Sequence, residues 1–278
     1  MRIAVLSGKG GTGKTFVSVN LACAADKAAY VDCDVEEPNG HLFLKPEITG
    51  RFPVLITVPQ VDADKCTACR KCVDFCRYNA QALIKDKLMT FYEVCHSCGG
   101  CIRFCPAKAL TEKERVIGTI EEGISGGVTV LTGCLNTGEV SGVPIIKELM
   151  EKLSGQGTVV VDCPPGSACV VMESIRKADF CVLVAEPTLF GVHNLSMVYE
   201  LVRLFNKPFG VVLNKCLPGK NPAQQFCMDK KIEVLAQITF DEELGRLNSK
   251  GLVAVRENRR YRELFRKLLK TLEKEAVL

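Results

Sequence analysis

The chain has 278 residues, with 36 Lys and Arg against 32 Asp and Glu and a formal net charge of +4. A hydrophobic content of 47% and a charged content of 24% exclude wholesale disorder, and the length suits one large domain or one domain with a small module. The longest apolar runs have about six residues, whereas a membrane-spanning helix needs about 20, so no integral membrane protein is expected. The net charge is too weak to indicate nucleic acid.

Sixteen cysteines set this composition apart. A secreted disulfide scaffold would be short and would follow a signal peptide, but residues 2–7 read as a β-strand rather than as the apolar core of such a peptide. We therefore expect reduced thiols in a cytoplasmic protein, and some of these thiols are expected to bind metal.

Strand and helix alternate over most of the chain. The pattern predicts strands at 2–6, 28–31 and 54–58 and a helix at 14–25, and a cysteine-rich stretch follows from 61 to 111. Strands are then expected at 128–131, 158–161, 180–184, 209–213 and 234–238, and helices at 143–153, 168–177, 192–206, 222–230, 241–250 and 259–275. This order is typical of an α/β fold with a mostly parallel sheet and helices on both faces. We expect one discontinuous domain over 1–61 and 113–278, interrupted by a small inserted module at 62–112.

Residues 8–15, Gly-Lys-Gly-Gly-Thr-Gly-Lys-Thr, fit two phosphate-binding motifs. The glycine spacing, with an acid about 20 residues later, matches the dinucleotide fingerprint, and the whole segment matches the P-loop. Lys14 and Thr15 have no role in a dinucleotide loop, whereas a nucleoside triphosphate needs a cation at its β- and γ-phosphates and a hydroxyl on Mg²⁺. A second apolar strand, which ends in Asp162, supplies the acid that a P-loop requires. The motif therefore indicates a P-loop.

Lys9 makes this loop read Lys-Gly-Gly-x-Gly-Lys-Thr, which resembles the deviant Walker A motif of the MinD, ParA, Mrp and nitrogenase iron protein ATPases. Residues 31–34 are similar to switch I of that family and residues 162–166 to its switch II. The resemblance covers the chain on both sides of the insert and is close to the MinD-like ATPases with an inserted ferredoxin domain. It implies a P-loop ATPase fold, Mg²⁺-dependent ATP hydrolysis that is slow without a partner, and an ATP-dependent homodimer.

The resemblance also implies which residues bind the phosphates and the metal ion. Lys14 would neutralise the β- and γ-phosphates, and Thr15 and Asp162 would hold Mg²⁺, with Asp32 near the metal. Asp34 would position the attacking water. The phosphate-binding loop itself would comprise Gly8, Lys9, Gly10, Gly11, Thr12, Gly13, Lys14 and Thr15.

Three further roles follow from the same resemblance. Gly166 would sense the γ-phosphate, and Lys9 would reach across the dimer to the partner's nucleotide, unless it is a solvated loop lysine. Asn214 would contact adenine or would only end its strand. The Asp that reads guanine is missing because residue 217 is Leu, so ATP is favoured.

Two cysteine runs share one spacing, namely Cys66, Cys69, Cys72 and Cys76, followed by Cys95, Cys98, Cys101 and Cys105. This is the spacing of bacterial two-cluster ferredoxins, in which the fourth Cys of each run ligates the other cluster. It predicts two [4Fe–4S] clusters, one held by Cys66, Cys69, Cys72 and Cys105 and the other by Cys76, Cys95, Cys98 and Cys101. Zinc sites pair two Cys-x₂-Cys turns and do not need the remaining cysteines. Over 62–112, eight Lys and Arg stand against six Asp and Glu, which should raise the cluster potentials and could favour an acidic redox partner.

Three functions compete on this sequence. An ATP-dependent redox protein uses both motifs, with a redox protein as its partner. A carrier for iron–sulfur or metal cofactors is an alternative, although the Cys-x₂-Cys pair that the Mrp group uses in its C-terminal half is missing here. A positioning ATPase would have no use for clusters. An amphipathic stretch at 261–272 predicts a last helix packed on the sheet, so membrane contact is not expected.

Overall fold

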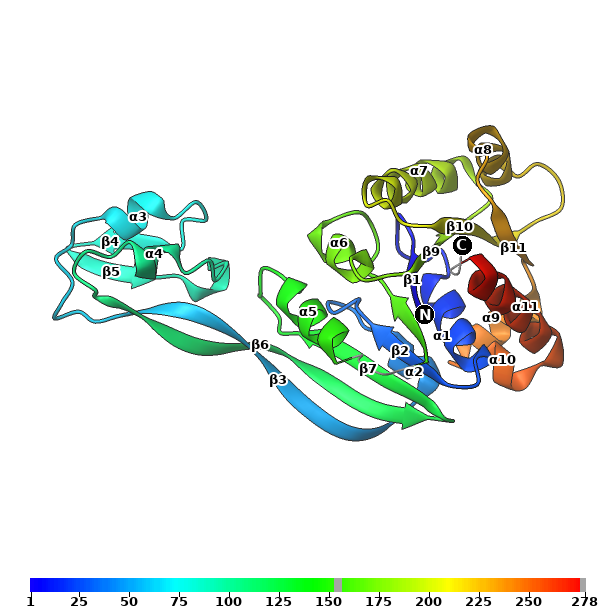
Figure 1. The fold of residues 1–278 in the computed structure, drawn as a ribbon, viewed down its shortest axis with the longest axis horizontal. Helices are drawn as coiled ribbons and strands as arrows, with labels where there is room; N and C mark the ends of the chain where they lie inside the picture. The colour runs from blue at the N-terminus through cyan, green and yellow to red at the C-terminus, as the bar shows by residue number, and fades with distance from the viewer. Residues whose placement is uncertain (153–156, 276–278) are drawn as a thin grey trace.

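The computed structural model describes residues 1–152 and 157–275, and within these ranges a nine-stranded sheet forms the centre of the molecule (Figure 1). Its strand order is β11-β10-β9-β1-β8-β2-β7-β6-β3, parallel from β11 to β7 and antiparallel at β6 and β3. The expected α/β fold with a mostly parallel sheet is confirmed. The strands are β1 (Arg2–Leu6), β2 (Ala28–Asp32), β3 (Glu47–Val61), β6 (Leu110–Ser125), β7 (Val128–Leu135), β8 (Thr158–Asp162), β9 (Phe180–Ala185), β10 (Phe209–Cys216) and β11 (Val234–Thr239).

Helices cover both faces of this sheet, because its central parallel strands have apolar side chains on both faces and both must be shielded from water. One face packs against α5 (Val143–Glu151), α6 (Cys169–Ile175), α7 (Leu189–Leu204) and α8 (Pro222–Lys230). The other packs against α1 (Lys14–Ala24), α2 (Gly40–Leu44), α9 (Glu242–Ser249), α10 (Ala254–Glu257) and α11 (Arg259–Glu275). The apolar stripe of α11 lies in this second core, where the ring of Phe265 is fully buried against that of Phe16. The last helix therefore packs on the sheet as expected.

The two longest strands form a ribbon that leaves the sheet. β3 and β6 pair antiparallel from Glu47 opposite Ile124 to Val61 opposite Leu110, and their far ends project well away from the other strands (Figure 1). The sequence pattern predicted only a short strand at 54–58 here. Pro53 and Pro59 are accommodated because β3 is the edge strand, where a missing amide costs no ladder hydrogen bond.

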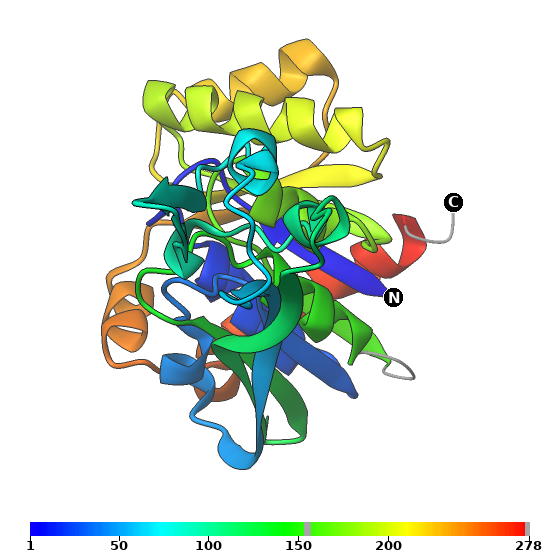
Figure 2. The same cartoon turned by 90° about the vertical axis from the view of Figure 1, so that its left-hand side faces the viewer.

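A small module occupies the far end of this ribbon, joined to both strands. It contains α3 (Lys71–Phe75), the hairpin of β4 (Gln81–Ile84) and β5 (Lys87–Thr90), the 3₁₀ turn η1 (Tyr92–Val94) and α4 (Gly100–Arg103). Its own small core joins Val58 of β3 to Ala80 and Cys95. Figure 2, turned by 90°, views the molecule from the end that carries this module.

Several predicted boundaries shift by a few residues. The helix predicted at 192–206 spans 189–204, because the Thr188 hydroxyl accepts the Gly191 amide at 2.9 Å and caps the helix earlier. Residue 153 of the helix predicted at 143–153, and residues 276–278 of the expected domain, lie outside the described residues. None of the helices described is both long and apolar enough to cross a membrane.

Candidate functional site

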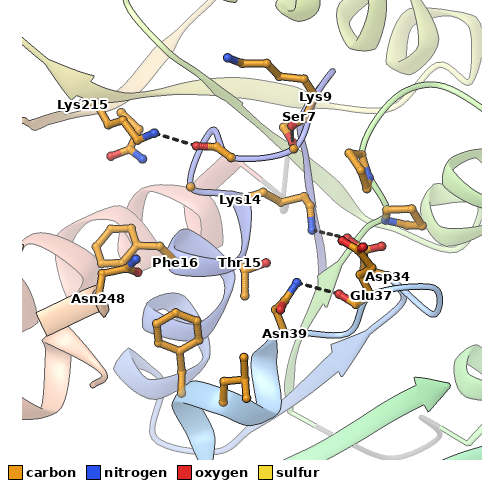
Figure 3. Close-up of a pocket in the computed structure, with 18 of the residues that line it drawn as sticks. Ser7, Lys9, Lys14, Thr15, Phe16, Asp34, Glu37, Asn39, Lys215 and Asn248 are labelled. Atoms are coloured by element: carbon orange, nitrogen blue, oxygen red, sulfur yellow. Dashed lines mark hydrogen bonds and ion pairs between the residues drawn. The ribbon is translucent and has the colours of Figure 1, made fainter. Parts of the chain in front are cut away.

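The glycine-rich loop connects β1 to the start of α1 and lines a cleft of about 810 Å³ (Figure 3). At two positions of the loop only glycine fits, because neighbouring atoms lie too close for a side chain. A Cβ on Gly8 would overlap the backbone of Asn194, and one on Gly13 would overlap the side chain of Asn214, while Gly13 also has a φ of 93°. The loop backbone is thus held close against α7 and β10, in the shape that a P-loop needs to present its amides to phosphate.

Lys14 lies at the centre of the site, with only 6% of its side chain exposed. Its Nζ donates to Asp162 Oδ1 at 2.7 Å and lies 3.7 Å from Asp34 Oδ2. The Ser18 hydroxyl donates to the same Asp162 oxygen at 3.0 Å. Burial lowers the pKa of Lys14, but the charges of the surrounding carboxylates, above all that of Asp162, raise it further, so the amine stays protonated. The structure therefore brings a buried cation and the two acids Asp34 and Asp162 together.

Asp32 and Asp162 end neighbouring strands and are linked through Tyr30. The two carboxylates are opposite one another in the register of β2 and β8, and both are fully buried. The Tyr30 hydroxyl donates to Asp162 Oδ2 at 2.9 Å and lies 3.3 Å from Asp32 Oδ2. Asp32 also accepts the Gly40 amide at 2.9 Å. Burial, together with the charge of Asp162, raises the pKa of Asp32. A cation bound nearby would therefore stabilise the charged form of this carboxyl.

Two of the three remaining predicted residues, Asp34 and Thr15, line the cleft, and Gly166 does not. Asp34 lines it with one-fifth of its side chain exposed, and burial raises its pKa to about 6 although the Lys14 charge opposes this. Thr15 also lines the cleft. The Gly166 amide donates to the Ser7 carbonyl at 2.9 Å, so it would have to leave that bond to sense a γ-phosphate. The roles predicted for these three residues stay predictions.

Lys9 is paired within its own chain. Its Nζ lies 2.7 Å from Glu186 Oε2 and 5.0 Å from the centre of the Phe190 ring. The other Glu186 oxygen accepts Lys215, which in turn donates to the Gly11 carbonyl at 2.7 Å. Burial raises the pKa of Glu186, but the two lysines lower it by more, which keeps the carboxylate charged. Lys9 is therefore not a freely solvated loop lysine here, and a contact across a dimer would require exchange of the Glu186 pair.

Asn214 holds the phosphate-binding loop through a side-chain hydrogen bond. Its amide Nδ2 donates to the Thr12 carbonyl at 2.8 Å, and the residue lines the cleft beside Phe240. The neighbouring Thr12 hydroxyl is buried and has no hydrogen-bond partner among the described residues. An unpaired buried hydroxyl in a loop of this kind is a position that a bound phosphate could satisfy. An adenine contact by Asn214 stays a prediction.

The eight cysteines of the small module line two cavities. The distal cavity is lined by Cys66, Cys69, Cys72 and Cys105, together with Leu110 at the far end of the ribbon. The proximal cavity is lined by Cys76, Cys95, Cys98 and Cys101, together with Thr57 and Pro59 of β3. The fourth Cys of each run thus lies with the first three of the other run. No group of three or more His, Cys, Asp or Glu close enough to bind a single metal ion is found in the part of the chain that the structure describes.

The backbone around the two cavities repeats. The second and fourth residues after the first Cys of each run have positive φ, with values of 52° at Ala68, 64° at Arg70, 55° at Ser97 and 69° at Gly99. The amides of Ala80 and Ala109 each donate to the sulfur of the fourth Cys of their run, at 3.3 Å. Left-handed conformations at non-glycine residues cost energy and are typical of sites where the chain must wrap a ligand.

Sequence reasoning did not identify Tyr30, Ser18 or Glu186. Tyr30 and Ser18 lie in a strand and a helix that read as core, and only the tertiary structure shows that their hydroxyls reach Asp162. Glu186 could have been noticed, because it directly follows a buried strand whose carboxyl end lies at the same sheet edge as the loop.

Comparisons with known proteins agree with this geometry. The sequence profile of the CobQ/CobB/MinD/ParA nucleotide binding domain matches residues 3–255. An uncharacterised protein of Methanocaldococcus jannaschii is 32% identical over 226 residues, which cover 77% of this chain and 80% of that protein. An iron-sulfur cluster carrier protein of the same organism is 22% identical over 298 residues, with coverages of 98% and 83%.

A solved structure shares the fold. The septum site-determining protein MinD of Pyrococcus horikoshii, in complex with Mg-ADP, has a TM-score of 0.61 at 19% identity, over 99% of this chain and 96% of that chain. Since the matching profile spans most of the sequence, and the P-loop and both acidic strand ends meet at one cleft, this chain belongs to the CobQ/CobB/MinD/ParA family of nucleotide-binding domains.

Proposed function

We propose that this protein hydrolyses ATP with Mg²⁺ and couples its nucleotide state to electron transfer through two [4Fe–4S] clusters, one in each cysteine cavity. The observation that carries the proposal is the sorting of eight cysteines into two sets of four around two cavities. The ribbon that bears these cavities pairs at its other end with β7, which pairs with the strand of Asp32. The inserted module would thus be a ferredoxin domain built onto the nucleotide-binding sheet.

The residues around the cavities fit such clusters. A [4Fe–4S] cluster takes four thiolates at four separate irons, so four cysteines spaced around a cavity suit it better than a single ion would. The amides of Ala80 and Ala109 would stabilise the thiolates of Cys76 and Cys105. The Ser97 hydroxyl, between Cys95 and Cys98 in the sequence, is buried without a partner among the described residues. When bound, each cluster accepts and releases one electron.

The nucleotide site would work through groups that are already assembled. Lys14 would exchange Asp162 for the β- and γ-phosphate oxygens, which frees the carboxylate to hold Mg²⁺ with Thr15. Mg²⁺ supplies neutralisation of the phosphate charge. Asp34, which lines the cleft, would orient the attacking water, and Lys9 of one protomer would complete the site of the other in an ATP-dependent homodimer.

Contacts between the end of switch I and the strands that carry the module support the coupling. The Leu135 amide of β7 donates to the carbonyl of Val35, which directly follows switch I, at 2.8 Å. In the loop that follows, Glu139 is 7% exposed and pairs with Arg115 of β6 at 2.7 Å. Arg115 pairs in register with Ile56, the neighbour of Thr57 in the lining of the proximal cavity. A shift of switch I would thus reach the proximal cavity through one backbone hydrogen bond and one ion pair.

Anaerobic redox titration with and without MgATP tests the proposal. The purified protein should contain about eight irons per chain, and a coupling free energy of about 1–3 kcal/mol would move at least one cluster potential by roughly 40–130 mV. Glu139→Gln should reduce this shift, whereas Glu151→Gln, on the exposed side of α5, should not. Stoichiometric zinc in place of iron, or equal potentials with nucleotide binding verified in the same sample, would refute the proposal.

A carrier function for iron–sulfur clusters is the second candidate. It is favoured by the similarity to the iron-sulfur cluster carrier protein and by the exposure of Cys69 and Cys98, one at each cavity. Two C-terminal cysteines, Cys216 and Cys227, are buried and cannot share a cluster across a dimer in this conformation. Transfer of iron to a cluster-free ferredoxin, measured with and without ATP, distinguishes a carrier from an electron-transfer protein, which would retain its iron.

A further inference from the structure

The two cysteine cavities lie at different depths along the ribbon. The proximal cavity includes Thr57 of β3, which pairs with Glu114, whereas the distal cavity includes Leu110, which pairs with Val61. Val61 lies four residues after Thr57, which is about 13 Å along the ribbon. The distal cavity is therefore farther along the ribbon from the nucleotide-binding sheet than the proximal cavity.

The rims of the cavities also differ in charge. Arg70 and Lys71 line the distal cavity, and Lys108 is exposed directly after its lining residues Pro106 and Ala107. Neither Lys71 nor Lys108 forms an ion pair with any residue that the structure describes, so both charges are available to a partner. The proximal cavity, whose lining is fully described, has no Lys, Arg, Asp or Glu in its lining. Of the two cavities, only the distal one thus has basic side chains in its lining.

The distal rim also has the features of a small electron-transfer interface. Cys69, which lines this cavity, is exposed at the surface of the protein. Encounters between electron-transfer proteins bury little area and depend on complementary charge to reach useful rates. Unpaired lysines near an exposed cysteine of the cavity match that requirement.

We infer that the distal rim, comprising Arg70, Lys71 and Lys108, is the docking surface for a reduced one-electron carrier protein with an acidic surface. This inference rests on the proposed function. The carrier would lose one electron, and a cluster held by Cys66, Cys69, Cys72 and Cys105 would gain it, without making or breaking a covalent bond. The cysteines of the proximal cavity would hold the second one-electron acceptor. ATP would act on the proximal cluster, and the partner would act on the distal one.

Stopped-flow reduction of the iron-loaded protein tests the docking surface, with a reduced acidic ferredoxin as the probe. The charge reversals Lys71→Glu and Lys108→Glu, combined in one chain, should lower the second-order rate constant at low salt at least about tenfold and flatten its salt dependence. The matched control is Arg77→Glu, an exposed residue of the same module that follows Cys76 of the proximal cavity. It should leave the rate constant nearly unchanged.

Two further measurements separate docking from folding and from the proposed function. Photoreduction by a neutral deazaflavin should be equally fast in all variants, and Lys71→Gln with Lys108→Gln should slow the ferredoxin reaction less than the charge reversals do. Equal slowing by Arg77→Glu, or no slowing by either pair of substitutions, would overturn the inference while leaving the clusters in place. Absence of iron from the unmutated protein would instead refute the proposed function.

Discussion

Asp34 should make the ligand-free protein less stable as the pH rises, and Asp34→Asn should remove this effect. Burial raises the pKa of Asp34 from 3.8 to about 6 against the opposing charge of Lys14, with further increases from Asp162 and two nearby glutamates. Between these two values the folded state holds a proton that the unfolded chain has released. Stability is therefore gained at low pH and is lost as the pH rises through about 6.

The size of the effect follows from the same two values. Between about pH 5 and pH 7.5, proton release from Asp34 removes about 1.4 kcal/mol of the free energy of unfolding. Because 19% of the side chain is exposed, solvent screening should reduce this loss to about 1 kcal/mol. For a domain of this size that corresponds to a change of roughly 2–4 °C in the melting temperature.

Differential scanning fluorimetry of the nucleotide-free protein measures the effect. The melting temperature of Asp34→Asn should rise relative to that of the unmutated protein as the pH increases from about 5 to 7.5. Glu151→Gln, which removes an exposed carboxylate at the end of α5 that does not act on the pKa of Asp34, is the control and should follow the unmutated protein. Parallel curves for Asp34→Asn and the unmutated protein would contradict the assigned pKa, as would a less stable Asn variant at the higher pH.

Three other substitutions test the remaining parts of the site. Lys9→Ala should keep the nucleotide affinity of the monomer but prevent the ATP-dependent dimer. If sedimentation velocity shows the same ATP-dependent dimer for both proteins, Lys9 does not act on the nucleotide of the partner protomer. Tyr30→Phe should cost about 1.5–3 kcal/mol of stability, because a buried hydrogen bond to a charged group is lost, and should slow ATP turnover. Tyr78→Phe, at an exposed tyrosine of the small module, should change neither. Thermal unfolding and phosphate release are the readouts. Cys66→Ala should lower the iron content from about eight to about four per chain, whereas Cys23→Ala should leave it unchanged in an iron assay.

Much of this protein could be predicted from local patterns in the chain. The P-loop, the acidic strand ends and both cysteine runs are short segments whose chemistry depends on spacing within about ten residues, so they can be read without the fold. The alternation of strand and helix likewise predicted a mostly parallel sheet, because apolar runs of this length must be buried on both sides. The ribbon of β3 and β6 was not predicted. Residues 111–115 of β6 are all polar or charged, so they lack the apolar alternation that indicates a strand.

Only the tertiary structure decided which distant groups act together. Lys14 and Asp162 are 148 positions apart and meet because the carboxyl ends of parallel strands lie at one edge of the sheet. The same edge places Glu186 beside Lys9, and the pairing of β2 with β8 aligns Asp32 opposite Asp162 within reach of the Tyr30 hydroxyl. The order of the two cavities along the ribbon was also hidden in the sequence. Both runs have the same spacing, and only the pairing of β3 with β6 makes one cavity face the nucleotide-binding domain and the other face solvent.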